Sequence, residues 1–406
     1  MRMIHTSDWH LGQYFFTKSR AAEHQCFLNW LIEQVTLHQV SAVIVAGDIF
    51  DTGSPPSYAR ELYNKFIVDL QKTGCQLVIL SGNHDSVSVL NESSALLAYL
   101  NTSVITSGAE PNIITLMDNQ GLPSGLVCAI PFLRPRDIQI SIAGQSSEEK
   151  QLSLQTAIHD YYQASYQLAV AQRETLGLDI PIIATGHLTV VGAALTDSVR
   201  DIYIGTLDAF PSGAFPPADY IALGHIHRPQ VIGGQQHIRY CGSPIPLSFD
   251  EAQQQKSVCL VEFNGSTLTD ITQLPIPISQ PLQSVKGSLK EIQQQLEVWQ
   301  DYQGDKPVWL DIEVASQDYL SDIQQRIEAL TQTLPVEVVL LRRARKQKQG
   351  QQSVLANETL NELTAEEVFL RRLAEESLDD AEQEQRLRQL FKQSYDALRS
   401  EQEGQA

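Results

Sequence analysis

The chain has 406 residues, of which 42% are hydrophobic, and its formal net charge at pH 7 is −19. Its five cysteines are scattered and form no C-x-x-C pair. This composition argues against a disordered chain, a membrane-spanning helix, a secretory signal, a zinc ribbon and a disulfide framework, so we expect a cytoplasmic protein of two or three domains. The acidic charge also argues against nucleic acid as a partner, because DNA-binding surfaces are usually basic.

Residues 1 to about 275 alternate short apolar stretches with helical patterns. Strands are predicted over 1–6, 42–46, 76–80, 126–130, 182–185, 220–223 and 257–263, and helices over 20–38, 57–72 and 90–100. Several of the strands are continuous apolar runs, which is typical of strands that are buried on both faces. The alternation of strands and helices predicts an α/β layered fold for residues 1–275.

A proline-rich stretch over 275–281 cannot form a regular helix and is interpreted as a linker. A small α+β unit is predicted after it, over 282–341. Its helices are expected at 290–299 and 318–330, and its strands at 308–314 and 336–341.

A basic linker is predicted over 342–356, and its first seven residues contain five positive charges. The next stretch, 357–400, predicts a hairpin of two helices, because pairs with the spacing of a capping box begin at Thr364 and Asp379. Each helix has an apolar face that the other cannot fully cover. The hairpin either packs on the body of the protein or binds a partner protein, and the preceding linker favours the partner.

Five short polar motifs follow predicted strands. They are Asp8-Trp9-His10, Gly47-Asp48-Ile49-Phe50-Asp51, Gly82-Asn83-His84-Asp85, Gly186-His187 and Gly224-His225-Ile226-His227. The carboxyl ends of strands form the ligand crevice in open α/β folds, so we expect the motifs to converge. Strand alternation predicts that Asp8 and His10 lie on one side of the chain and Trp9 on the other.

The motifs together supply carboxylates, an amide and imidazoles, a mixture that suits Mn²⁺, Fe²⁺ or Zn²⁺. So many ligands exceed the needs of one tetrahedral ion but suit two ions ~3.5–4 Å apart that share a bridging carboxylate. Five of the ten histidines fall in these motifs. The remaining five are interpreted as ordinary core or surface residues: His5, His24, His38, His159 and His237.

The ordered motif set resembles the calcineurin-like metallophosphoesterase family. Within that family, the stretches 6–12, 46–51 and 130–135 are similar to the Mre-type DNA repair nucleases. The resemblance implies a layered β-sandwich flanked by helices. It also implies two divalent metal ions, most simply Mn²⁺, with a ligand set of Asp8, His10 and His227 for the first ion, Asp48 for both, and Asn83, His187 and His225 for the second.

The resemblance further implies that His84 lies beside the scissile phosphate and either donates a proton to the leaving oxygen or stabilises charge there. Asp85 would orient His84, whereas Asp51 has no comparably defined role. Related phosphoprotein phosphatases place an arginine soon after this motif, but residues 86–90 contain none. The absence of that arginine favours a phosphodiester substrate over a phosphoprotein.

As a member of this nuclease group, the chain would cleave DNA in repair, recombination and replication. It would act as an ATP-dependent exonuclease on double-stranded ends and as an endonuclease on single strands and hairpins. The sequence lacks a G-x-x-x-x-G-K-[ST] motif, so ATP would be handled by an SMC-like ABC ATPase bound to the hairpin over 357–400. The unit over 282–341 would be a DNA-capping domain.

A homodimer within a heterotetramer is also implied. The helices over 57–72 and 90–100 would pair across the dimer, with Leu62, Phe66, Leu97 and Leu100 as candidate contacts. The basic stretch over 342–348 either contacts phosphate, lines the route to the partner ATPase, or is a solvated loop. Further candidates for DNA contacts are Lys18, Arg20, Arg134 and Arg136.

Two other functions remain open from the sequence. The same fold could serve a nucleotide or small-molecule phosphodiesterase, but the capping unit and the hairpin would then have no obvious purpose. A catalytically silent scaffold that bridges DNA ends is the other alternative, and the complete ligand set argues against it.

Overall fold

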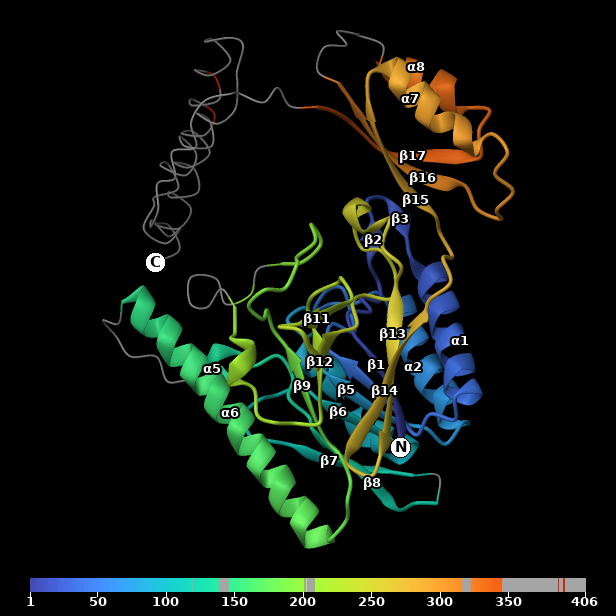
Figure 1. Ribbon diagram of the computed structural model, residues 1–406. Coiled ribbons are helices and arrows are strands. Elements are labelled where there is room, and N and C mark those ends of the chain that lie inside the picture. The colour runs from blue at the N-terminus through green and yellow to red at the C-terminus, as the bar shows by residue number, and fades with distance from the viewer. Residues whose placement is uncertain are drawn as a thin grey trace, which may run out of the picture. The chain divides into compact units, whose positions relative to one another are not determined.

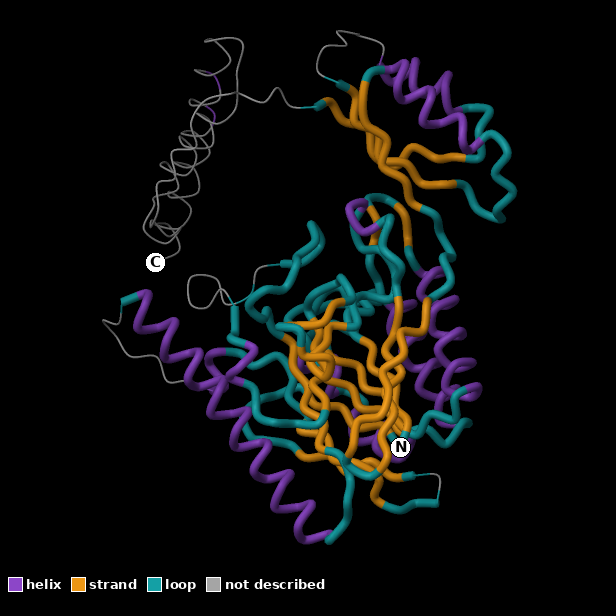
Figure 2. The backbone as a smooth tube through the Cα atoms, viewed as in Figure 1, coloured by secondary structure: helices purple, strands orange, loops and turns teal. Residues whose placement is uncertain are grey.

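The computed structural model describes residues 1–118, 120–138, 146–200, 202, 209–315, 323–344, 386 and 390. The predicted hairpin over 357–400, apart from two single residues, lies outside the described residues, as does the end of the basic stretch. No helix in these described ranges is long and apolar enough to cross a membrane. The same ranges contain two six-stranded sheets and a three-stranded sheet (Figure 1, Figure 2).

The first six-stranded sheet is mainly parallel. Its strands, in spatial order, are β14 (Thr267–Pro275), β13 (Ser257–Asn264), β1 (Arg2–Thr6), β4 (Ala42–Ala46), β5 (Gln76–Leu80) and β6 (Thr102–Ile105). β13 and β14 form the antiparallel edge. Helices α1 (Ala21–Leu37) and α2 (Ser57–Gln71) cover one face and bury Trp9, Phe27 and Phe66 against it (Figure 1).

The second six-stranded sheet is also mainly parallel. Its strands are β11 (Gln230–Ile232), β12 (Gln235–Tyr240), β10 (Tyr220–Gly224), β9 (Ile182–His187), β8 (Pro123–Cys128) and β7 (Ile113–Met117). The four central strands run parallel and both edge strands are antiparallel. Helix α6 (Ser147–Leu176) packs its buried residues Leu154, Ile158 and Tyr162 on the outer face.

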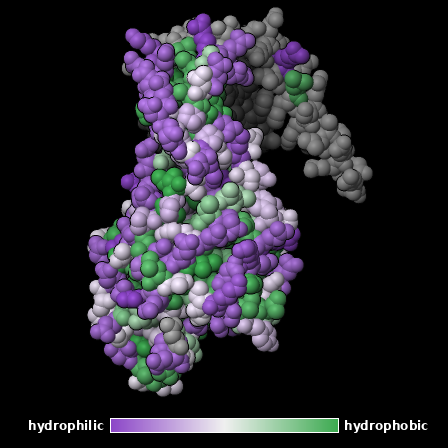
Figure 3. Space-filling view, turned by 90° about the vertical axis from the view of Figure 1, so that its right-hand side faces the viewer, coloured by the Kyte–Doolittle hydropathy of each residue, from purple (hydrophilic) through white to green (hydrophobic). Residues whose placement is uncertain are grey.

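The inner faces of the two sheets share a third core, to which Ile44, Ile183 and Tyr220 belong. The layers are therefore helix, sheet, sheet and helix, and the predicted β-sandwich flanked by helices is confirmed (Figure 1). Seen from the side on which α1 lies, the surface is mostly hydrophilic, and its apolar side chains form small separate groups (Figure 3).

The three-stranded sheet lies in the unit predicted over 282–341, but its last strand continues to Arg343, so the first two residues of the predicted basic linker belong to the sheet. Its strands β15 (Leu282–Gly287), β16 (Val308–Val314) and β17 (Val336–Arg343) are all parallel. Helices α7 (Leu289–Leu296) and α8 (Ile323–Thr331) connect them and bury Ile292 and Ile327 against the sheet.

Short elements complete the described chain. They are β2 (Tyr14–Phe15), β3 (Lys18–Ser19), α3 (Val87–Asn91), α4 (Ser94–Leu97), α5 (Pro135–Ile138) and the 3-10 turns η1 (Ala98–Leu100), η2 (Ser212–Ala214), η3 (Phe249–Glu251) and η4 (Glu297–Trp299). The helix predicted over 90–100 is thus divided among α3, α4 and η1. Two of the predicted dimer contacts, Phe66 and Leu97, are buried in the core of the chain itself.

Candidate metal centre and active site

The loop after β1 presents two predicted ligands in an unusual backbone conformation. Asp8 and His10 have φ angles of 53° and 46°, in the left-handed region, so strand alternation is not what places them on one side. Such a conformation at a non-glycine residue costs of order 1–3 kcal/mol. It is held by the burial of Trp9 against Phe27 and Phe66 and by hydrogen bonds from the Asp8 and His10 N–H groups to the chain after β4.

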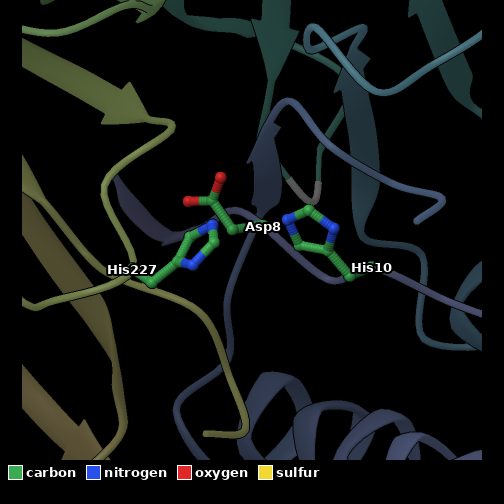
Figure 4. A group of neighbouring side chains, drawn as sticks. All are labelled: Asp8, His10 and His227. Carbon is green, nitrogen blue, oxygen red and sulfur yellow. The ribbon is translucent and has the colours of Figure 1, made fainter. Parts of the chain in front are cut away.

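The first cluster joins this loop to the loop after β10. Asp8, His10 and His227 point toward one another, and each offers a ligand atom within 4.8 Å of the others (Figure 4). The Asp8 carboxylate accepts hydrogen bonds from the His225 N–H at 2.9 Å and the Ser7 hydroxyl at 2.5 Å. These donors fix the carboxylate before any ion binds.

The second cluster contains Asp48, His187 and His225. One oxygen of Asp48 lies 3.2 Å from His187 Nε2 and 3.6 Å from His10 Nε2, so a single carboxylate reaches both clusters. The Asn83 side-chain oxygen lies 2.9 Å from His187 Nε2 and 3.2 Å from His225 Nδ1. All seven predicted ligands are therefore brought together.

Close packing between the strand ends requires glycine at two motif positions. A side chain on Gly82 would meet the Asp48 carboxylate at 2.1 Å, and one on Gly224 would meet the Ala46 carbonyl oxygen at 1.8 Å. Gly82 therefore lets the loops after β4 and β5 of the first sheet approach each other, and Gly224 lets β10 of the second sheet approach β4 of the first, which brings ligands from both sheets into one centre.

The electrostatics fit an ion-binding centre. Burial lowers the pKa of His187, but the neighbouring Asp48 carboxylate outweighs burial and raises that pKa to about 9. Burial raises the pKa of Asp48, yet the His187 charge holds it well below its usual range. His10 Nε2 and His225 Nε2 are buried with no hydrogen-bond partner in the described part of the chain. Unpaired imidazole nitrogens beside buried carboxylates are what divalent ions require.

His84 lies at the edge of the two clusters. Its Nδ1 is 2.7 Å from the Asp51 carbonyl oxygen, which can only accept, so Nδ1 bears the proton and Nε2 remains for proton exchange. Its backbone N–H donates to Asp48 at 2.9 Å. Burial lowers the pKa of His84, which keeps the metal-free imidazole neutral near pH 7.

Asp85, which was expected to orient His84, hydrogen-bonds to other groups instead. The Asp85 carboxylate is buried and accepts from the backbone N–H groups of Ile49, Phe50 and Gly82 at 2.8–3.1 Å. It therefore braces the loop after β4, and burial raises its pKa to about 6. Asp51 contacts the catalytic region instead, because its carbonyl holds His84 and its carboxylate lies 3.2 Å from His10 Nδ1.

Sequence reasoning missed the groups behind the ligands. The Ser7 hydroxyl contacts Asp8, and a set around His227 includes the buried Glu251 and Lys256 and the half-buried Ser198. Ser7 directly follows β1 but is not a member of the five polar motifs, and Ser198, Glu251 and Lys256 follow no strand, so only their contacts identify them.

The four basic residues that were expected to contact DNA differ in how far their side chains are buried or already paired. Arg20 is fully buried in an ion pair with Glu23 and cannot reach DNA. Lys18 pairs with Glu337, and Arg134 donates to the Asp85 carbonyl oxygen at 3.2 Å. Arg136 is exposed.

We compared the chain with protein-family models and with known proteins. The family model for calcineurin-like phosphoesterases matches residues 1–229, and the model for the type 5 capsule protein repressor C-terminal domain, SbcD_C, matches residues 279–377. The SbcD component of the nuclease SbcCD from Escherichia coli (strain K12) is 58% identical over 404 residues, which cover 99% of this chain and 100% of that protein. The chain belongs to the SbcD family of calcineurin-like phosphoesterases.

Two further members of the SbcD family are more distant than the Escherichia coli protein. The SbcD protein of Rhodobacter capsulatus is 34% identical, over 68% of this chain and 70% of that protein. The SbcD protein of Bacillus subtilis is 30% identical, over 79% of this chain and 81% of that protein. The expected membership of a nuclease family with metal-dependent phosphoesterase chemistry is confirmed.

Proposed function

We propose that this chain is the nuclease component of a complex with the SMC-like ABC ATPase SbcC and hydrolyses DNA phosphodiesters in the cytoplasm. It would be an ATP-dependent exonuclease on double-stranded ends and an endonuclease on single strands and hairpins, in DNA repair, recombination and replication. The single observation that supports this most is the Asp48 carboxylate, which reaches both histidine clusters as a bridging ligand must. Membership of the SbcD family supports the substrate.

The proposed metal content is two Mn²⁺ ions. Asp8, His10 and His227 would hold the first, Asn83, His187 and His225 the second, and Asp48 both. When bound, such a pair supplies a hydroxide nucleophile and clamps the phosphate oxygens. With Nδ1 kept protonated and the ring oriented by the Asp51 carbonyl, His84 would take up a second proton from solvent at Nε2 and donate it to the leaving oxygen, or stabilise charge there.

The proposed division of the chain follows from this function. Residues 1–275 would form the nuclease domain, 282–341 a DNA-capping domain, 342–356 a basic linker and 357–400 the helical hairpin that binds the ATPase. Support for the capping role comes from the contact of the three-stranded sheet with the β2–β3 hairpin, where Trp309 and Phe15 stack with ring centres 6.1 Å apart. This hairpin begins four residues after His10.

A homodimer is proposed through α2 and the α4–η1 turn. Burial of Phe66 and Leu97 moves the candidate contacts to neighbouring side chains. Val68, Leu96 and Tyr99 are 50%, 66% and 86% exposed. Apolar side chains this exposed on adjoining elements are typical of a surface covered in an assembly.

The test uses the full-length chain with Mn²⁺ and with linear duplex, single-stranded and hairpin DNA, each with and without the ATPase and ATP. We expect degradation of duplex ends only when the ATPase and ATP are present, and no cleavage by an Asp48→Asn variant. Turnover of a chromogenic phosphodiester without cleavage of any DNA would instead support a small-molecule phosphodiesterase. Absence of stoichiometric metal would support the silent scaffold.

A further inference from the structure

A buried carboxylate lies behind the first cluster. Glu251, at the end of η3, is fully buried although it belongs to none of the motifs. One of its oxygens lies 2.6 Å from Lys256 Nζ and accepts from the Leu247 N–H at 3.1 Å. The other accepts from the Thr196 hydroxyl at 2.9 Å. So many donors hold the side chain in one orientation.

The Ser198 hydroxyl connects Glu251 to His227. Its oxygen is hydrogen-bonded to Glu251 and lies 2.5 Å from His227 Nδ1. An ionised carboxylate can only accept, so the single Ser198 proton is donated to Glu251, and the Ser198 oxygen must accept from Nδ1–H of His227. This assignment leaves the lone pair of His227 on Nε2, which is the form that can ligate an ion.

Lys256 acts on the backbone of the same histidine. Its buried ammonium donates to the His227 carbonyl oxygen at 2.9 Å and to the Ser243 hydroxyl at 3.0 Å. The ion pair thus holds His227 at two points, the ring through Ser198 and the main chain directly. Burying both charges is unfavourable unless each finds several partners, as these do.

We propose that Glu251 and Lys256 are positioning residues for His227, which set the tautomer of its ring and thereby the affinity of the first metal position. This inference rests on the proposed metal centre. Carboxylates that hold a ligating histidine through its second nitrogen typically change metal affinity by 10–100-fold when they are removed.

Glu251→Gln is the sharpest variant because the size of the side chain is kept. Its amide can donate to Ser198, whose hydroxyl would then donate to His227 Nδ1 and move the ring proton to Nε2. We expect calorimetric Mn²⁺ titration of the full-length protein to show one of two sites weakened about 10–100-fold and the other unchanged. Asp250→Asn is the matched control, since it changes a carboxylate that is less buried in the same turn.

Two further measurements keep the proposal testable if Glu251→Gln fails to fold. Ser198→Ala should weaken the same site, and Ser198→Thr, which keeps the hydroxyl, should restore it. In the metal-free protein, nitrogen chemical shifts of labelled histidine should show His227 protonated at Nδ1 in the wild type but not in Ser198→Ala.

Wild-type affinity for both ions in folded Glu251→Gln and Ser198→Ala, or an Nε2-protonated His227 in the wild type, would overturn the proposal. Failure of the wild type itself to bind two ions would instead overturn the proposed function, and the tautomer measurement does not depend on metal.

Discussion

Asp48 and His187 form a buried ion pair when no metal is present, with 3.2 Å between a carboxylate oxygen and Nε2. The pKa of His187 is raised to about 9, above its ordinary value of 6.5. The pair therefore stabilises the metal-free fold fully below pH 6.5, and this contribution is lost as the pH rises through about 9. The same proton competes with a metal ion for Nε2.

Metal binding is therefore expected to release a proton. Because His187 is protonated at pH 7.5 and only the neutral ring can bind metal, Mn²⁺ binding should release at least one proton, and Mn²⁺ affinity should rise as the pH increases toward 9. Calorimetry in buffers of different ionisation enthalpy measures the number of protons. His237→Gln, outside the site, is the control, and heats that do not depend on the buffer would contradict the assignment.

A second prediction concerns the part of His84 in DNA cleavage. Its Nδ1 is held by the Asp51 carbonyl oxygen, so a proton can pass only through Nε2. Replacing it with alanine should slow DNA cleavage by about 10²–10⁴-fold, the usual contribution of a positioned proton donor, and should leave binding of both Mn²⁺ ions intact. Single-turnover cleavage and metal titration measure the two effects.

His38→Ala, at the C-terminal end of α1, is a suitable control for that experiment. Cleavage by His84→Ala at the rate of the wild type would exclude His84 from the reaction.

At the scale of elements, the ligands come from the ends of five strands in two sheets. β1, β4 and β5 belong to the first sheet, and β9 and β10 to the second. The centre therefore exists only when both sheets pack together, since neither sheet holds a complete set of ligands. Parallel strands favour this, because their carboxyl ends lie along the same edge.

The exposed apolar side chains of α2 and the α4–η1 turn lead to a test of assembly. The double variant Leu96→Asp and Tyr99→Asp should convert a dimer into a folded monomer, because charges cannot be buried there without partners. Sedimentation velocity measures the mass. Leu152→Asp with Leu168→Asp on α6 is the control, with starting exposures of 65% and 50%. A wild type that stays monomeric at micromolar concentration would contradict the proposed dimer.

For the whole molecule, the net charge of −19 remains the main constraint on DNA binding. Several basic side chains are already engaged by carboxylates: Arg20 with Glu23, Lys18 with Glu337, and Arg342 with Asp311. The acidic Asp8 and Asp48 would be neutralised by bound ions. These ion pairs and the net acidic charge reduce the positive charge that the described surface offers to DNA.

We expect the isolated chain to bind duplex DNA weakly, with a Kd of about 10⁻⁶ M or higher at physiological salt and a steep loss of affinity as salt increases. Fluorescence anisotropy over a salt series measures both. Addition of the ATPase should tighten binding, because its surface would supply much of the positive field. Nanomolar binding by the isolated chain would show that a basic surface exists elsewhere on it.

The sequence by itself determined seven of the twelve strands of the described sandwich, and it pointed to all seven candidate ligands. The strands β6, β7, β11, β12 and β14 were not predicted. Continuous apolar runs and the glycine, aspartate and histidine motifs are local signals, and they need no knowledge of neighbours. Helix α6 was not predicted, although the capping box of Ser146 with Glu149 and the terminal Gly177 mark its two ends.

Only the tertiary structure decided which groups hold the ligands. Asp85 lies next to His84 in the chain but binds the backbone after β4, and the carbonyl of Asp51 takes the place expected for it. Glu251 reaches His227 from a loop 24 residues further along. Such contacts depend on how distant segments pack, whereas a sequence pattern reports only the preferences of residues close together in the chain.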